Sequence, residues 1–132
     1  MSKESVERVR QAYRLYEETQ QPDYEFLHRN VAWHTAQDLP DSDTYRGHQG
    51  IAELYSDWID SFEDFRVEVE EIIDAGREMV VVMTRLRGRF RGSTEEVNLI
   101  EAHVWKVVDG KAVEIREYRT KAEALEAAGL SD

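Results

Sequence analysis

The sequence predicts one domain of the α+β class, with N-terminal helices packed on the concave face of a curled antiparallel β-sheet. Two observations support this prediction. Apolar residues recur at helical spacing in two stretches before residue 63 of the 132-residue chain, and from Phe65 onward the spacing changes to two. The strand-like segments are joined by short connections, so consecutive strands are expected to pair antiparallel.

Two stretches have the apolar spacing of amphipathic helices. Residues 4–19 carry one apolar stripe among charged residues, and residues 50–62 carry a wider stripe. The first stripe consists of Val6, Val9, Tyr13 and Tyr16. The second consists of Ile51, Leu54, Tyr55, Trp58, Ile59 and Phe62. Each helix is expected to bury this stripe against the sheet.

The segment between these helices is expected to be irregular. Pro22 and Asp23 predict a short second helix that runs to about His28. Residues 31–34 are expected to form a brief strand, and residues 35–49 an acidic loop over the mouth of a pocket.

The second half of the chain predicts a sheet. Residues 65–70 alternate apolar and charged side chains, and three further strand-like runs follow at about 78–90, 95–108 and 112–119, separated by glycine turns. A capping box at residues 120–123 then predicts a short C-terminal helix.

Composition excludes several kinds of site and partner. Cysteine is absent, which excludes disulfides and thiolate chemistry. The net charge of −11 opposes binding to nucleic acid or to anionic lipid. The N-terminus lacks the apolar core of a signal peptide, and the longest apolar run, residues 79–83, is too short to span a membrane. We therefore expect a soluble cytoplasmic protein that binds neither nucleic acid nor membrane.

No metal or cofactor is predicted. The four histidines, His28, His34, His48 and His103, show no H-x-H or H-x-x-x-H spacing and no supporting carboxylate register. Glycine-rich phosphate loops and the G-x-S-x-G motif are also missing.

Several short motifs resemble a known family when they are taken in order. They are Val31-Ala32-Trp33-His34, the stretch Tyr45-Arg46-Gly47-His48-Gln49-Gly50-Ile51, the stretch from His103 to Lys111, and Arg116-Glu117-Tyr118. From about residue 4 to residue 129 the chain resembles the nuclear transport factor 2-like superfamily, and within it the SnoaL-like proteins.

This resemblance implies a cone-shaped fold with a pocket for a small hydrophobic molecule between helices and sheet. It also implies a homodimer that forms through the outer sheet face. It implies no single activity, because relatives include polyketide cyclases, ketosteroid isomerase, limonene epoxide hydrolase and scytalone dehydratase.

His34 is the first candidate for catalysis. By the resemblance it falls where ketosteroid isomerase has its carboxylate base and where epoxide hydrolase positions a water. A neutral imidazole can accept a proton near pH 7. If the alignment has a gap elsewhere in the loop, Asp38 takes this position instead. The alternative role for His34 is structural, with its ring hydrogen-bonded only to the loop backbone.

Glu117 and Arg85 are expected to form a polar pair inside the pocket. Val113 and Ile115 indicate that this face of the last strand points inward. By the resemblance, Glu117 matches an acid of epoxide hydrolase and Arg85 the arginine that bridges its two acids. Arg87 stands where the second acid would be, which argues against that reaction. Because an unpaired buried ion costs several kcal/mol, we expect Glu117 to pair with Arg85, either for chemistry or only to hold the pocket's shape.

The third sheet strand, residues 95–108, has two possible orientations. By the same alignment we assign Glu101 and His103 inward, which leaves Ile100, Ala102 and Val104 as an outer apolar patch suited to a dimer interface. The opposite orientation has almost equal support from hydrophobicity. The residues predicted to line the pocket are Tyr13, Tyr16, Trp33, Trp58, Arg87, Leu99, Glu101, His103, Ile115 and Arg119.

Two hypotheses for function follow. In the first, the protein is a cofactor-independent isomerase, cyclase or hydrolase that acts on a hydrophobic cyclic metabolite, with His34 as general base. In the alternative, it is a non-catalytic ligand-binding or dimerisation module whose pocket is filled, with Arg87 and Arg89 plugging the cone through ion pairs.

Overall fold

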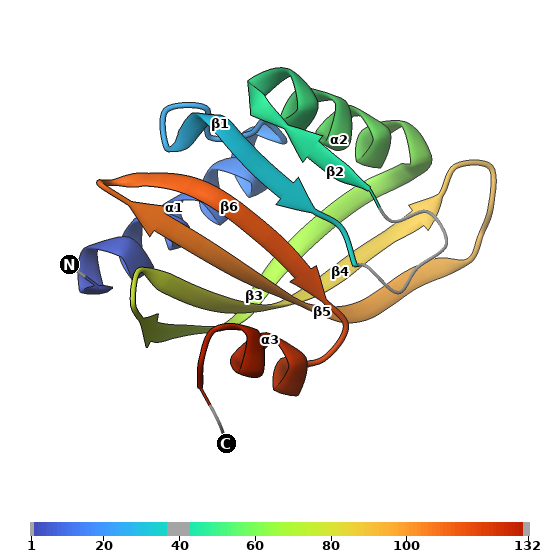
Figure 1. Ribbon diagram of the computed structural model, residues 1–132. Coiled ribbons are helices and arrows are strands. Elements are labelled where there is room, and N and C mark those ends of the chain that lie inside the picture. The colour runs from blue at the N-terminus through green and yellow to red at the C-terminus, as the bar shows by residue number, and fades with distance from the viewer. Residues whose placement is uncertain (1, 37–42, 131–132) are drawn as a thin grey trace.

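The computed structural model describes residues 2–36 and 43–130, which form three helices and one six-stranded sheet (Figure 1). The elements are α1 (Ser2–Thr19), β1 (Leu27–His34), β2 (Thr44–Arg46), α2 (Gly47–Ser61), β3 (Phe62–Gly76), β4 (Met79–Phe90), β5 (Glu96–Val108), β6 (Lys111–Tyr118) and α3 (Lys121–Ala127). This arrangement confirms the predicted α+β class. Among the described helices, none is long and apolar enough to cross a membrane.

The sheet has the order β2-β1-β6-β5-β4-β3. The four long strands from β3 to β6 pair antiparallel in sequence order, as predicted, and β1 joins them by pairing parallel to β6. The β3–β4 ladder shifts register at three places, and such bulges bend a strand and increase its twist. The long strands therefore curl around the helices that cover one face.

The main core lies between this concave face and helices α1 and α2. Val9 and Tyr13 of α1 and Ile51 of α2 pack with Val82 and Trp105 of the sheet. Burying a side chain of this size stabilises the fold by roughly 1.5–3 kcal/mol. The stripes predicted for both long helices are therefore the faces that pack on the sheet.

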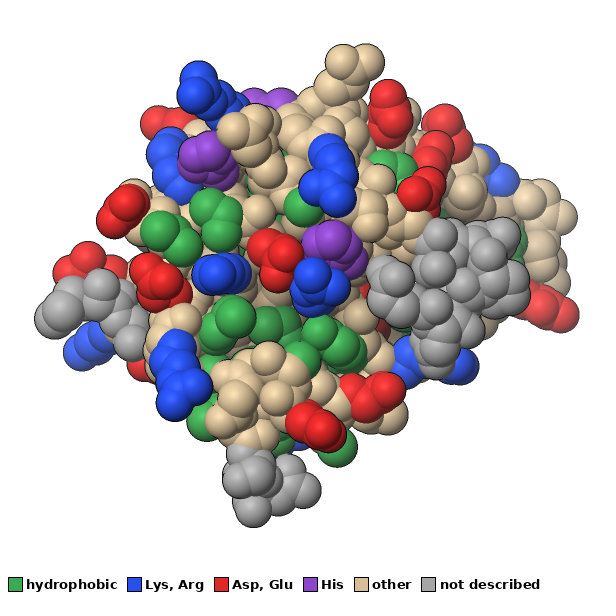
Figure 2. Space-filling model, in the orientation of Figure 1, with side chains coloured by type: hydrophobic (Ala, Val, Ile, Leu, Met, Phe, Trp, Pro, Cys, Tyr) green, Lys and Arg blue, Asp and Glu red, His purple; other side chains and the backbone are tan. Residues whose placement is uncertain are grey.

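Helix α3 covers part of the opposite, outer face of the sheet. Thr120 caps it by accepting the backbone N–H of Glu123 at 3.1 Å. Ala124 of α3 packs against Ala102 and Val104 of β5, which are both buried. Figure 2 shows hydrophobic side chains gathered where the sheet meets this helix, with charged side chains of both signs beyond them.

The predicted outer apolar patch is thus mostly an intramolecular contact. Only Ile100 of the three residues assigned to it stays exposed, at 46%. The homodimer itself remains a prediction.

The predicted short helix near Pro22 is wrong, because the chain turns there and enters β1 at Leu27. Asp23 explains the turn. Its carboxylate accepts the backbone N–H of Phe26 at 3.3 Å and two bonds from Arg8, at 2.5 and 3.2 Å. These contacts hold the carboxylate against the turn, and Phe26 and Leu27 are then buried in the core.

Candidate functional site

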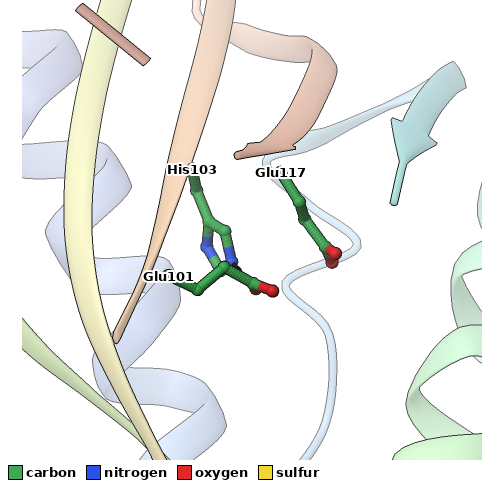
Figure 3. A group of neighbouring side chains, drawn as sticks. All are labelled: Glu101, His103 and Glu117. Carbon is green, nitrogen blue, oxygen red and sulfur yellow. Dashed lines mark hydrogen bonds and ion pairs between the residues drawn. The ribbon is translucent and has the colours of Figure 1, made fainter. Parts of the chain in front are cut away.

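Two neighbouring strands place three ionisable side chains together on the concave face of the sheet (Figure 3). Glu101 and His103 are two residues apart on β5, so their side chains share a face. Glu117 of β6 is the register partner of His103. The ligand atoms of these three residues, which we call the interior cluster, lie within 4.8 Å of one another.

His103 is held from both sides of its ring. Its Nε2 lies 2.8 Å from Glu101 Oε1, and its Nδ1 lies 2.6 Å from the hydroxyl of Tyr13. Trp105 donates its indole N–H to the same hydroxyl at 2.8 Å. Because an indole N–H only donates, the Tyr13 oxygen accepts this bond and can pass its own proton toward Nδ1. For a neutral ring, Nε2 then carries the hydrogen that Glu101 accepts.

The environment raises the pKa values of Glu117 and His103 above their ordinary values. Burial raises the pKa of Glu117 to about 7, and the charge of Glu101 adds to this effect. His103 and the indole N–H of Trp33, which lies 2.7 Å from Glu117 Oε2, act in the opposite direction. For His103, burial lowers the pKa, but the hydrogen bond and charge of Glu101 outweigh it and raise the pKa above its usual value. Glu117 can therefore gain and lose a proton near pH 7.

The interior cluster borders a small cavity inside the cone, in two adjoining compartments. The polar compartment has a volume of about 70 Å³ and the aromatic compartment about 20 Å³. The polar compartment is lined by Trp58, Phe65, Val67, Leu86, Glu101, His103 and Glu117. The aromatic compartment is lined by Ala12, Tyr13, Tyr16, Trp33, Tyr55, Trp58, Val67, His103 and Trp105.

These compartments are too small for a ring compound as they stand. An apolar cavity that holds benzene has a volume of ~150 Å³. Trp58 lines both compartments and is only partly buried, so its movement would join and enlarge them.

A wider hollow of about 250 Å³ lies at the ends of β3, β4 and β5. Its walls are mostly charged side chains, including Glu63, Arg66 and Arg87, and it contains none of the groups with shifted pKa values. The interior cluster is therefore the better candidate for a site.

A family model for SnoaL-like polyketide cyclases matches residues 8–127. The chain belongs to the SnoaL-like polyketide cyclase family. No curated protein sequence matches it.

Solved structures share the fold of this SnoaL-like protein over nearly the whole chain. Bal32a, from a soil-derived mobile gene cassette, is 16% identical with a TM-score of 0.79, and the match covers 96% of each chain. An NTF2-like protein from Burkholderia thailandensis E264 is 20% identical with a TM-score of 0.77, covering 92% of this chain and 96% of that one. TerC, co-crystallised with polyporic acid, is 22% identical with a TM-score of 0.72, covering 95% of this chain and 98% of that one. At these identities the likeness shows the fold alone.

His34 does not line the cavity of the SnoaL-like cone, so that prediction is wrong. Trp33 points into the core, and the next residue of a strand points to the opposite face. On that outer face His34 Nδ1 lies 3.1 Å from Thr44 Oγ1, and Nε2 lies 3.4 Å from Glu114 Oε2. Burial and the charge of Arg116 lower the pKa of His34.

The predicted Glu117–Arg85 pair is also wrong. Arg85 lies on the outer face, where it donates to Glu70 at 2.8 Å and to Asn98 at 2.7 Å. Arg87 donates to Glu68 at 2.9 Å.

Arg89 lies 3.5 Å from Glu63. Neither Arg87 nor Arg89 lines either compartment, so the cone is not plugged by arginine ion pairs. Aromatic rings fill it instead.

The other predicted residues divide into two groups. Those that line a compartment are Tyr13, Tyr16, Trp33, Trp58, Glu101, His103 and Glu117. Those that do not are Ile115, which is fully buried in the core, Leu99, which is 50% exposed, and Arg119, which is exposed beyond the end of β6. Asp38 lies outside the described residues.

Phe65, Val67 and Leu86 also line the compartments, although they were not among the predicted pocket residues. The period-two pattern of β3 carries the signal for Phe65 and Val67, because both share its inward face. The interior cluster was not predicted as a unit either. An E-x-H pair opposite a glutamate becomes visible only when the register of β5 and β6 is known.

The interior cluster is also the group of described side chains close enough together to hold a metal ion. In the present arrangement Glu101 already occupies His103 Nε2, so a metal would have to displace the hydrogen between them. The absence of a metal cofactor remains a prediction.

Proposed function

We propose that this SnoaL-like protein binds a small, largely apolar ring compound inside the cone and transfers protons on it without a cofactor, as an isomerase, cyclase or hydrolase. One observation carries the proposal. Glu117, with a pKa of about 7, borders an aromatic-lined cavity beside a second acid and a histidine. General acid–base catalysis is most efficient when the pKa of the group lies near the working pH.

Glu117 is the proposed proton carrier. Trp33 and the backbone of Ala36 donate to its carboxylate, which still has lone pairs to accept a substrate hydrogen. As a base, Glu117 takes a proton from a carbon next to a carbonyl, and the C–H electron pair moves toward the carbonyl oxygen. The protonated carboxyl then returns the proton to another atom of the same molecule.

His103 and Glu101 have supporting roles. The raised pKa of His103 favours its protonated form, and that form would place positive charge next to the oxygen on which negative charge develops. Glu101 orients the ring through its 2.8 Å bond to Nε2. Its own charge also helps to keep the pKa of Glu117 near neutrality.

The aromatic walls support a ring-shaped ligand. Tyr13, Tyr16, Trp33, Tyr55 and Trp58 all border the aromatic compartment. Such rings offer a planar apolar ligand large contact areas and edge-to-face contacts. A ligand of this kind also agrees with the description of the family as polyketide cyclases.

The test uses proton exchange on a general probe, because it needs no knowledge of the natural substrate. Ring ketones such as cyclohexanone and 2-tetralone are incubated with the protein in D₂O, and loss of the hydrogens next to the carbonyl is followed by NMR. Glu117→Gln should lower the catalysed exchange by about 10²–10⁴-fold. Glu114→Gln, on the outward face of the same strand, is the matched control and should keep the wild-type rate. Exchange no faster than in buffer, or equal exchange in Glu117→Gln, would contradict the proposal.

The second candidate is a non-catalytic module with a filled interior. It is favoured by the small volumes of the compartments, about 70 and 20 Å³. A thermal-shift screen against ring compounds distinguishes the two, since a ligand at a hundredfold excess over its Kd stabilises the fold by about 2.7 kcal/mol. No stabilisation by any compound, together with no exchange, would favour this candidate.

We also propose that the protein forms a homodimer through the outer sheet face. Ile100 is 46% exposed on this face, so a charged substitution at Ile100 tests the interface. Light scattering at micromolar concentration should give a dimer mass for the wild type and a lower mass for Ile100→Glu. A monomer mass for the wild type would contradict it.

A further inference from the structure

The hydroxyl of Tyr16 is buried and has no hydrogen-bond partner among the described residues. Tyr16 is 4% exposed, and it borders the aromatic compartment. An unsatisfied buried hydroxyl costs ~1–3 kcal/mol, and the large majority of buried polar atoms in native proteins are hydrogen-bonded. The Tyr16 oxygen therefore needs a partner that the described part of the chain does not supply.

Other aromatic rings surround Tyr16 and cover it from solvent. Its ring meets Tyr55, Trp58 and Phe65 edge to face, at centroid distances of 5.4, 6.4 and 6.4 Å. Burial raises the pKa of Tyr16 to about 12, so its hydroxyl keeps its proton and can donate at physiological pH. The hydroxyl is thus a protonated donor in the wall of the aromatic compartment.

Tyr13, one helical turn away on α1, differs from Tyr16 because its hydroxyl is hydrogen-bonded. Its hydroxyl lies 2.6 Å from His103 Nδ1 and accepts the indole N–H of Trp105 at 2.8 Å. Both tyrosines border the aromatic compartment, but only Tyr13 is tied to the interior cluster. Of these two hydroxyls, the one of Tyr16 is left to bond a ligand, and it is the one that is fully buried without a partner among the described residues.

The aromatic compartment, which Tyr16 borders, has the volume of one water molecule. Its volume of about 20 Å³ exceeds the ~10–15 Å³ that a single water requires. A polar ligand group of similar size can replace such a water and keep its hydrogen bond. The compartment adjoins the polar one through Trp58, Val67 and His103, so one ligand can extend from Glu117 to Tyr16.

We infer that Tyr16 is a specificity-determining residue, and that the ligand is a ring compound with a hydrogen-bonding oxygen at each end. One oxygen belongs to the reacting carbonyl near Glu117, and the other accepts the hydroxyl of Tyr16. This inference rests on the proposed function and adds the second polar group to the substrate class.

The experiment compares 2-tetralone with 6-hydroxy-2-tetralone, which adds one oxygen at the end far from the carbonyl. Affinities are measured by calorimetry for the wild type, Tyr16→Phe and Tyr55→Phe. The wild type should bind the hydroxylated ketone about tenfold more tightly, the factor that one net hydrogen bond provides. Tyr16→Phe should lose this preference, bind 2-tetralone as the wild type does, and unfold at the same or a higher temperature without ligand. Tyr55→Phe should keep the preference.

Three results would overturn the inference. They are equal wild-type affinities for the two ketones, a preference that survives in Tyr16→Phe, and a preference that disappears in Tyr55→Phe instead. If the wild type binds both ketones equally and exchange still depends on Glu117, only the role of Tyr16 is refuted. If neither ketone binds and no exchange is seen, the proposed function is refuted as well.

Discussion

Trp33 donates its indole N–H to Glu117 Oε2 across 2.7 Å, and the two residues come from β1 and β6, the parallel pair of the described sheet. The bond ties the proposed proton carrier to a strand that precedes it by 84 positions in sequence. A hydrogen bond donated to a carboxylate favours its charged form. Trp33 therefore limits how far burial can raise the pKa of Glu117.

Replacing Trp33 by Phe should raise the pKa of Glu117 above its present value of about 7. The variant removes the indole donor and keeps an aromatic ring in the core. Carbon-13 NMR titration of the glutamate carboxyl groups measures the change, with Glu117→Gln used to assign the signal. A pKa that stays constant or falls would show that the bond does not control Glu117.

Glu117→Gln should change how stability depends on pH. The pKa of Glu117 is about 7 in the folded protein against an ordinary value of 4.5. The folded state therefore binds this proton more tightly than the unfolded state does. The stability that the bound proton contributes is complete below about pH 4.5 and is lost as pH rises through about 7. Glutamine does not ionise, so the variant should gain on the order of 2–3 kcal/mol relative to the wild type between pH 4.5 and pH 8.

Urea unfolding at these two pH values measures that gain, and Glu114→Gln is the control. Burial raises the pKa of Glu114, but its bonds to Arg116 and His34 lower it overall. This control should therefore show no gain at high pH. A stability difference between Glu117→Gln and wild type that does not change with pH would refute the assignment of Glu117 as a buried acid.

Trp58→Ala should join the two compartments and admit ring compounds more readily. The indole lines both, and removing a buried Trp costs ~3–5 kcal/mol of folding free energy, less here because Trp58 is partly exposed. Calorimetry with 2-tetralone should show tighter binding, and urea unfolding should show the lower stability. Glu53→Ala, on the exposed side of the same helix, should change neither quantity. Unchanged affinity in Trp58→Ala would mean that this ring does not control entry.

His34→Ala should leave proton exchange on ring ketones at the wild-type rate. His34 lies on the outer face beside Glu114, and loss of this partly exposed contact should cost at most ~1 kcal/mol. NMR exchange rates and urea unfolding provide the two measurements. A large fall in the exchange rate, with stability maintained, would show that His34 takes part in the proton transfer.

His34 and Arg85 show which part of the site the sequence could not predict. The period of the apolar pattern is a local property, so the class of fold and the long helices follow from it. The phase of a strand is harder to obtain, because a shift of one residue moves every side chain to the other face. Residues 79–83 of β4 are apolar throughout, since Val80 and Val82 pack under the helices while Val81 and Met83 pack under α3.

Hydrophobicity therefore carried no information on which side of β4 Arg85 lies. The same reason applies to β1, where Ala32 and Trp33 are both buried although they face opposite sides. The parallel pairing of β1 with β6 is a contact between distant segments and has no local signal. By contrast, Val113 and Ile115 on the same face of β6 indicate the inward side of that strand, and Glu117 lines the polar compartment.

The hydrogen bonds that hold His103 also determine where protons can travel. They run from Trp105 through Tyr13 and His103 to Glu101, and Trp105 at the inner end can donate a hydrogen but cannot accept one. A proton cannot continue past Trp105, so this chain of bonds is closed at its inner end. Glu101, whose side chain is 16% exposed against 3% for His103, is the outer end. Hydrogen exchange between solvent and the His103 ring should therefore pass through Glu101, and a ligand that covers Glu101 would isolate the ring from bulk water.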